Sequence, residues 1–475
     1  MRRQMEVFMA VATDKSANAW LKYDRKTQNE VMAFAEEYRQ FISANKTERE
    51  CAESIIKKAK ALGFKDVAGV KKVKTGDRLY ASLMGKTVAL FLIGTEPLEK
   101  GMKILGAHID SPRLDLKQQP LYEGKDNAGR DADLAYLDTH YYGGIKKYQW
   151  VTLPMAMHGV ICKKDGTVVK VSIGDEPGDP VFGISDLLPH LAAEQMTKTG
   201  TKIVEGENLD VTFASMPLTG EKKEAVKANA LKLLSKKYKV EEDDFLSAEI
   251  EIVPAGEARN MGIDSSMIMG YGHDDRVCAF PSAEALFSLT KTDRTAVCLL
   301  VDKEEIGSVG ATGMHSRFFE NTVAEILERM GNYSELNVRR ALQNSVMLSS
   351  DVSAAFDPIY PDVSQTRNTA FLGRGVVFNK YTGSRGKYDS NDSSPEFFAK
   401  IRKVFDDAGV SYQTAELGKV DAGGGGTIAY IMANYGMNVI DSGVAVQNMH
   451  APWEVISKAD LFEALKGYLA FLREM

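Results

Sequence analysis

Residues 297–308 read VCLLVDKEEIGS, an apolar run that ends in two adjacent acids, Glu304 and Glu305. The apolar part has the length and composition of a buried β-strand, which we place at 295–301. Two carboxylates at the end of such a strand do not contribute to a hydrophobic core. They suit a metal-dependent hydrolase, in which one acid binds the ion and its neighbour takes a proton from water. The alternative is a pair of solvated charges.

Strands and helices alternate along two separate parts of the chain. Near its start, helices are expected over 24–44 and 47–62, and apolar strand-like runs follow, the second at 102–105. After residue 265 the alternation returns and continues to a closing helix at 459–473. This order predicts an α/β fold with a mostly parallel central sheet that is flanked by helices on both faces.

The region between these two parts has a different character. Residues 117–139 are polar and are expected to form loops, whereas 160–171 reads as two short strands around an Asp-Gly hairpin signal. A chain of 475 residues is also long for a single core. We therefore predict one discontinuous domain, formed by 1–114 and 256–475, that is interrupted by a β-rich inserted domain at 115–255.

Composition excludes several classes of partner. The formal net charge of -6 and the pI of about 5.8 argue against a nucleic-acid partner, which needs a basic surface. Residues 1–7 lack the apolar core of a signal peptide, and no stretch approaches the ~18 apolar residues of a membrane span. No cysteine lies in a C-x-x-C pair, so we expect buried free thiols rather than ligands or disulfides. These features predict a cytoplasmic protein with no membrane partner.

His108 and Asp110 follow the apolar run at 102–105, and Pro112 would end that strand. Residues two apart in a strand point to the same side, so Asp110 could orient the ring of a metal-binding His108. The alternative is a surface His-x-Asp sequence without such a function.

Three further residues follow strands or precede a helix in the same way. Asp274 precedes a helix, Asp351 follows the apolar run 346–348, and His450 follows the strand expected near 438–446. Taken singly, each has an ordinary alternative as a helix cap, a turn residue or a loop histidine. Because parallel strands bring their carboxyl ends to one edge of a sheet, the set predicts a metal centre there. Two histidines and three acids without cysteine favour catalytic Zn²⁺, with Co²⁺ or Mn²⁺ as alternatives.

The motifs HIDSP at 108–112, DDR at 274–276, EEIGS at 304–308, SSD at 349–351 and MH at 449–450 occur in this order. They resemble the motifs of the aspartyl aminopeptidase, or aminopeptidase I, family of dinuclear zinc exopeptidases. The stretch YGGIKKYQW at 142–150 is similar to the bacterial branch of that family. The resemblance implies a metal-dependent aminopeptidase that hydrolyses the N-terminal residue from peptide substrates.

The resemblance also implies a division of two divalent metal ions among the predicted ligands. His108 and Asp351 would bind one ion, and Glu305 and His450 would bind the other. Asp274 would bridge the two ions.

Three other residues receive roles from the same resemblance. Glu304 would be the general base toward a water activated by the two ions, and Asp110 would orient His108. The inserted domain would serve dimerisation and act as a lid, with His190 reaching a neighbouring subunit's active site to stabilise the oxyanion. The family assembles as a homo-oligomer, a tetrahedral dodecamer built from dimers. The chain departs from the family after Asp351 and after His450, so a preference for acidic N-terminal residues is not implied.

Two other stretches have open interpretations. The glycine run at 421–427 resembles a phosphate loop, but no Gly-Lys-Ser/Thr follows it, so a wall of the substrate site is preferred. Lys380, Arg385 and Lys387 lie in a basic loop that either binds a substrate carboxylate or is a solvated turn. For the whole chain, the alternatives are another dinuclear zinc hydrolase, such as a deacylase or carboxypeptidase, and a non-catalytic binding protein.

Overall fold

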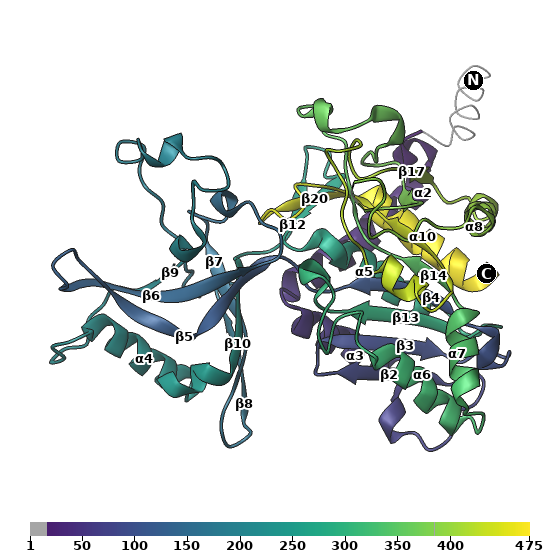
Figure 1. Cartoon of the computed structure of the whole chain (residues 1–475), viewed down its shortest axis with the longest axis horizontal. Helices are drawn as coiled ribbons and strands as arrows, with labels where there is room; N and C mark the ends of the chain where they lie inside the picture. The colour runs from purple at the N-terminus through teal and green to yellow at the C-terminus, as the bar shows by residue number, and fades with distance from the viewer. Residues whose placement is uncertain (1–16, 384) are drawn as a thin grey trace. The chain divides into compact units, whose positions relative to one another are not determined.

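The computed structural model describes residues 17–383 and 385–475. The segment 1–7, for which no signal peptide is predicted, lies outside the described residues. The chain divides into two compact units, which are treated separately below (Figure 1). The first unit contains the described residues up to Asp110, together with Ala258–Met449 and Glu454–Met475. The second unit contains Ser111–Glu257 and the short segment His450–Trp453.

A nine-stranded sheet forms the centre of the first unit. In spatial order its strands are β1 (Lys65–Asp66), β2 (Arg78–Leu83), β3 (Thr87–Leu92), β13 (Ala296–Val301), β4 (Lys103–His108), β14 (Val346–Ser349), β18 (Asn438–Gly443), β16 (Val376–Asn379) and β17 (Tyr412–Thr414). The four central strands β13, β4, β14 and β18 are parallel, so their carboxyl ends lie at one edge. The predicted α/β fold with a mostly parallel sheet is confirmed.

Helices cover both faces of this sheet. One core contains residues of α2 (Arg25–Ala44), α3 (Glu48–Ala61), α5 (His273–Phe287), α8 (Pro395–Asp407) and α10 (Lys458–Glu474). The other contains residues of α6 (Phe318–Arg329), α7 (Glu335–Gln343) and α9 (Ala429–Ala433). Along β13, Cys298 and Leu300 enter the first core, whereas Val297 and Leu299 enter the second. This two-sided burial explains why the strand reads as a continuous apolar run.

The ends of two helices follow the expected capping chemistry. Thr47 accepts a hydrogen bond from the Glu50 N–H at 3.2 Å, and Glu50 Oε2 accepts one from the Thr47 N–H at 3.1 Å. This reciprocal capping box starts α3. Ser394 caps α8, whose first residue is Pro395.

A smaller five-stranded sheet completes the first unit. Its strands are, in spatial order, β11 (Arg259–Met261), β12 (Met267–Gly270), β20 (Glu454–Ser457), β19 (Ala445–Gln447) and β15 (Ser353–Ala354). Because β20 pairs with β12 directly before α5, Glu454 is held close to the start of that helix.

The second unit contains a six-stranded antiparallel sheet and one α-helix. Its strands are, in spatial order, β8 (Val168–Ile173), β7 (Met155–Cys162), β10 (Ala248–Pro254), β5 (Arg113–Lys125), β6 (Asp131–Tyr142) and β9 (Val211–Ala214), and its helix is α4 (Ala225–Tyr238). The expectation that 117–139 forms loops is wrong, since β5 and β6 are the longest strands of this sheet. Their paired residues Leu121 and Leu137 are buried, while many of the intervening polar residues are exposed. Such a half-exposed strand has too few apolar residues to stand out in the sequence.

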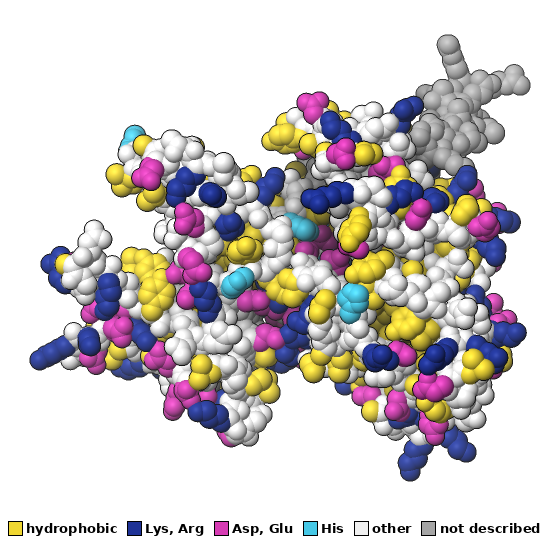
Figure 2. Space-filling model, in the orientation of Figure 1, with side chains coloured by type: hydrophobic (Ala, Val, Ile, Leu, Met, Phe, Trp, Pro, Cys, Tyr) yellow, Lys and Arg dark blue, Asp and Glu magenta, His cyan; other side chains and the backbone are white. Residues whose placement is uncertain are grey.

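The predicted free thiols are present, since Cys51, Cys278 and Cys298 are buried and Cys162 is partly exposed. Among the described residues, no helix is both long and apolar enough to cross a bilayer. Basic and acidic side chains are intermixed over the visible face in Figure 2, and the described residues form no continuous basic field on it.

Candidate metal centre

The carboxyl end of β4 carries a buried histidine, His108, whose ring contacts Asp110 on one side. His108 is the last residue of the strand and is 1% exposed. Its Nδ1 lies 3.0 Å from the carbonyl oxygen of Asp110 and 3.2 Å from Asp110 Oδ1. Its Nε2 faces the other way, 3.1 Å from Asp274 Oδ1. Asp110 therefore contacts one side of the ring, and Nε2 on the other side faces the carboxylates of Asp274 and Glu304.

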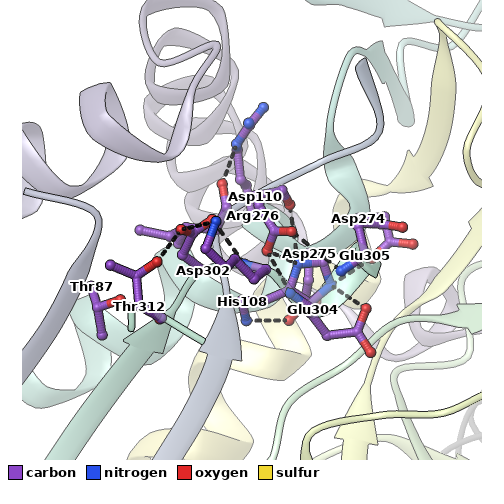
Figure 3. Close-up of polar contacts among 12 residues, drawn as sticks. Thr87, His108, Asp110, Asp274, Asp275, Arg276, Asp302, Glu304, Glu305 and Thr312 are labelled. Carbon is purple, nitrogen blue, oxygen red and sulfur yellow. Dashed lines mark hydrogen bonds and ion pairs between the residues drawn. The ribbon is translucent and has the colours of Figure 1, made fainter. Parts of the chain in front are cut away.

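The same Asp110 carboxylate fixes the acidic pair that follows β13. Glu304 and Glu305 begin a short 3₁₀ turn, Glu304–Ile306. The Glu304 N–H donates to Asp110 Oδ1 and the Glu305 N–H donates to Asp110 Oδ2, each at 3.2 Å. Figure 3 shows this region, in which the Asp110 carboxylate, two residues past β4, accepts hydrogen bonds from the two glutamates that follow β13.

Asp274 and Asp275 lie at the entry to α5, where both have non-helical backbone angles. The backbone is therefore kinked at these two acids, directly before the regular part of the helix. The Asp274 N–H donates to Glu454 Oε2 at 3.0 Å, and the His108 N–H donates to Asp275 Oδ2 at 3.4 Å. Contacts with β20 and β4 thus hold this segment, and the Asp274 carboxylate faces His108.

Asp351 follows the end of β14 and is 8% exposed. Together with the residues above, it forms part of a cluster that contains three groups of possible ligands; within each group the ligand atoms lie within 4.8 Å of one another, and Asp351 belongs to two of the groups. The groups are His108 with Glu304 and Asp351, His108 with Asp274 and Glu305, and Asp274 with Asp275 and Asp351. The structure therefore brings together His108, Asp110, Asp274, Glu304, Glu305 and Asp351. Asp275 belongs to the cluster as well; it is not among the predicted site residues, and its only signal in the sequence is its place next to Asp274 in the DDR motif.

Burial and neighbouring charges shift the pKa values of three groups in the cluster. Burial, reinforced by the charge of Glu304, raises the pKa of Asp351 well above its usual value. Burial likewise raises the pKa of Asp275. Burial acts to lower the pKa of His108, but its hydrogen bonds with Asp110 and Asp274 outweigh burial, so that pKa is raised well above the ordinary value. One imidazole and several converging carboxylates form a donor set that suits a divalent cation, and Zn²⁺ accepts both ligand types.

The other two predicted histidines belong to the second unit. His450 Nδ1 lies 2.8 Å from the carbonyl oxygen of Gly144, in the YGG motif. His190 is exposed on the segment between β8 and β9. Their roles as metal ligand and oxyanion donor stay predictions.

A cavity of about 230 Å³ in the first unit joins the two stretches with open interpretations. It is lined by Arg385 and Lys387 from the basic loop and by Gly423 and Gly424 from the glycine run. The Lys380 and Lys387 ammonium groups both pair with Asp392, at 2.6 and 3.0 Å.

A family model, curated relatives and solved structures all place this chain in the same protein family. The model of the aminopeptidase I zinc metalloproteases (M18) matches residues 41–472. A probable M18 family aminopeptidase 1 of Clostridium acetobutylicum is 59% identical over 460 residues, which cover 96% of this chain and 97% of the relative. The crystal structure of an M18 aminopeptidase from Thermotoga maritima superposes with a TM-score of 0.92 at 44% identity, covering 97% of this chain and 99% of that one. The crystal structure of aminopeptidase I from C. acetobutylicum gives 0.89 at 56% identity, with the same coverage.

Proposed function

Because the chain belongs to the aminopeptidase I (M18) family of zinc metalloproteases, we propose that it hydrolyses N-terminal residues from peptides at the His108 edge of its central sheet. The observation that carries this proposal is the convergence of His108, Asp274, Glu305 and Asp351, whose possible ligand atoms form groups within 4.8 Å. These residues come from four separate parts of the chain and are all at the carboxyl edge of parallel strands or at a helix entry. That is where ligands bind in open α/β sheets.

The ligands would divide between two divalent ions, with zinc as the favoured metal. His108 and Asp351 would bind one ion, Glu305 and His450 the other, and Asp274 would be shared. Support comes from the position of His108 Nε2, 3.1 Å from Asp274 Oδ1. When bound, such ions lower the pKa of a water molecule and polarise a substrate carbonyl.

Glu304 would act as the general base and then return the proton to the leaving amine. Its backbone is fixed by Asp110, while its side chain is 17% exposed and so remains accessible at the rim of the cluster. General-base catalysis typically contributes ~10²–10⁴-fold to the rate. Asp110 would be a positioning residue, because it contacts the His108 ring and both glutamate N–H groups.

The second unit would serve dimerisation and act as a lid, and His190 would stabilise the oxyanion in a neighbouring subunit. Leu187, Leu188 and Leu191 beside His190 are each more than half exposed, which leaves apolar surface for a second copy to cover. A solved structure of the S. cerevisiae mApe1 dodecamer, 20% identical, has the same fold. We propose a homo-oligomer, a dodecamer built from dimers, for this chain as well.

A panel of free and N-acetylated aminoacyl amides tests the function, with a chelator and added zinc as further arms. We expect hydrolysis of free amides only, loss of activity with the chelator, and recovery with zinc. Release of acetate from the acetylated substrates would instead indicate a deacylase, and equal hydrolysis of their amide bond would show that the free α-amine is not required. Hydrolysis that the chelator leaves unchanged would exclude a metal-dependent reaction.

A further inference from the structure

The loop that carries the acidic pair has a strained backbone. Lys303 and Ser308 have φ angles of 69° and 59°, in the left-handed region that non-glycine residues rarely adopt. Gly307 between them has a φ of 92°. Such conformations persist only where surrounding contacts hold the backbone in place.

One buried carboxylate ties the two ends of this loop together. Asp302 is the residue directly after β13, at the start of the loop, and is 1% exposed. Its Oδ1 accepts from the Lys303 N–H at 2.8 Å, and its Oδ2 accepts from Thr312 Oγ1 at 2.5 Å. The Asp302 N–H also donates to the Thr312 carbonyl at 3.3 Å. Asp302 and Thr312 therefore close the loop 303–312 at its base.

A second hydroxyl attaches this base to the sheet. Thr87 Oγ1, at the start of β3, donates to the Thr312 carbonyl at 2.6 Å. Strand β3 is the antiparallel neighbour of β13. Thr87 and Thr312 are 1% and 2% exposed, so water does not compete for these hydrogen bonds. Figure 3 shows Thr87, Thr312 and Asp302 as a continuous chain of contacts in the strand region beside the metal cluster.

Asp110 and Asp302 thus act on the same short segment from its two sides. Asp110 accepts the N–H groups of Glu304 and Glu305, whereas Asp302 accepts the N–H of the preceding Lys303. Three successive N–H groups are fixed by two buried carboxylates. Among the described contacts of the loop, those of Thr312 are the ones that attach its C-terminal end to the sheet.

We propose that Asp302, Thr312 and Thr87 form a loop-base clamp, a set of positioning residues that aim Glu304 at the reacting water. The proposal rests on the function proposed above, in which Glu304 is the general base. The clamp contacts neither substrate nor metal, so its loss impairs proton transfer while peptide binding is retained.

Thr312→Val tests the clamp, because valine keeps the shape of threonine and removes only the hydroxyl donor. We expect kcat to fall about 10-fold or more with KM within about 2-fold, since a displacement of ~1 Å can cost ~10²-fold. Thr312→Ser retains the hydroxyl and should keep kcat within about 3-fold of the parent protein. Zinc content should be the same in all three proteins.

Thr322→Val is the matched control. Its hydroxyl is also buried, but it donates to the Phe318 carbonyl within α6 and lies outside the clamp. We expect its kcat to equal that of the parent. Hydrogen exchange of the segment 303–308 should be faster in Thr312→Val than in Thr322→Val, a readout that does not depend on activity.

The outcomes separate the two proposals. If the parent protein hydrolyses aminoacyl amides and Thr312→Val retains its kcat, the clamp is wrong and the function stands. Equal losses in Thr312→Ser and Thr312→Val would also overturn it, because the hydroxyl would then be irrelevant. If the parent protein does not hydrolyse aminoacyl amides, the proposed function is wrong. The clamp is then tested by hydrogen exchange alone, and equal exchange rates of 303–308 in Thr312→Val and Thr322→Val would overturn it. If Thr312→Val does not fold, Thr87→Val replaces it as the test. We expect kcat of Thr87→Val to fall about 3-fold, and an unchanged kcat would contradict the clamp.

Discussion

The two units position their predicted functional residues by different means. In the first unit, His108, Asp110 and Glu304 follow parallel strands, are largely buried, and are fixed by hydrogen bonds between neighbouring strand ends. In the second unit, His190 is an exposed residue of an irregular segment. A packed sheet edge is a rigid scaffold, whereas an exposed segment acquires a fixed position only when something covers it. Chemistry that needs sub-ångström placement belongs on the first kind of structure.

The largest effect should come from the first unit. Glu304→Gln removes the proposed general base but keeps the size of the side chain, so kcat should fall by ~10²–10⁴-fold. Zinc content should be retained, because Glu304 is not proposed as a ligand. Glu335→Gln, at an exposed acid on α7, is the control. Activity near that of the parent would show that another group is the base.

The contribution of the second unit should be smaller but measurable. His190→Ala should lower kcat by ~10²-fold, the lower end of the range for an oxyanion donor. His140→Ala, another exposed histidine of this unit, should have no effect. Mixing His190→Ala subunits with Glu304→Gln subunits should restore part of the activity if His190 acts in a neighbouring subunit. A loss below 2-fold in His190→Ala would show that His190 does not stabilise the oxyanion.

Substitution of Asp110, a proposed positioning residue of the first unit, should have the next largest effect. Asp110→Asn keeps the shape of the side chain but weakens its hydrogen bonds to His108 Nδ1 and to the two glutamate N–H groups. We expect zinc affinity to fall by ~10–100-fold, as for other carboxylates that orient a metal-binding histidine. Competition with a zinc chelator measures this change. Unchanged affinity would mean that Asp110 does not orient His108.

The smallest effect should be one of stability alone, in the second unit. Glu123 is buried, and its Oε2 accepts the N–H groups of Val226 and Lys227 at the start of α4, at 2.9 and 3.0 Å. Glu123→Ala should cost ~0.5–2 kcal/mol of unfolding free energy, the range for loss of a helix cap. Denaturant unfolding measures it, and kcat should not change. A tenfold loss of kcat would link this sheet to catalysis more closely than we propose.

The sequence was informative where local pattern and topology agree. A two-sided buried strand such as β13 is a continuous apolar run, and parallel strands must end at one edge. These two facts predict that His108, Glu305 and Asp351 lie at one edge, and the structure places them close together with Asp274 at the entry of α5. The capping box of Thr47 and Glu50 is local and was predicted for the same reason.

The sequence was uninformative where long-range pairing decides the structure. Strands β5 and β6 are polar along their exposed positions and were predicted as loops, because only their pairing with each other and with β10 and β9 defines them. Thr312 and Thr87 are separated by 225 residues, so no spacing in the sequence relates them. The proposed roles of His190 and His450 depend on more than the fold of the second unit, so they stay predictions.

Diffraction data collected on either side of the zinc absorption edge, from crystals grown with zinc, would test the central claim directly. We predict two anomalous peaks at the carboxyl edge of the central sheet, one bonded to His108 and Asp351, one to Glu305, with Asp274 in contact with both. An anomalous map without zinc at His108 Nε2, with these side chains bonded only to one another, would contradict the account.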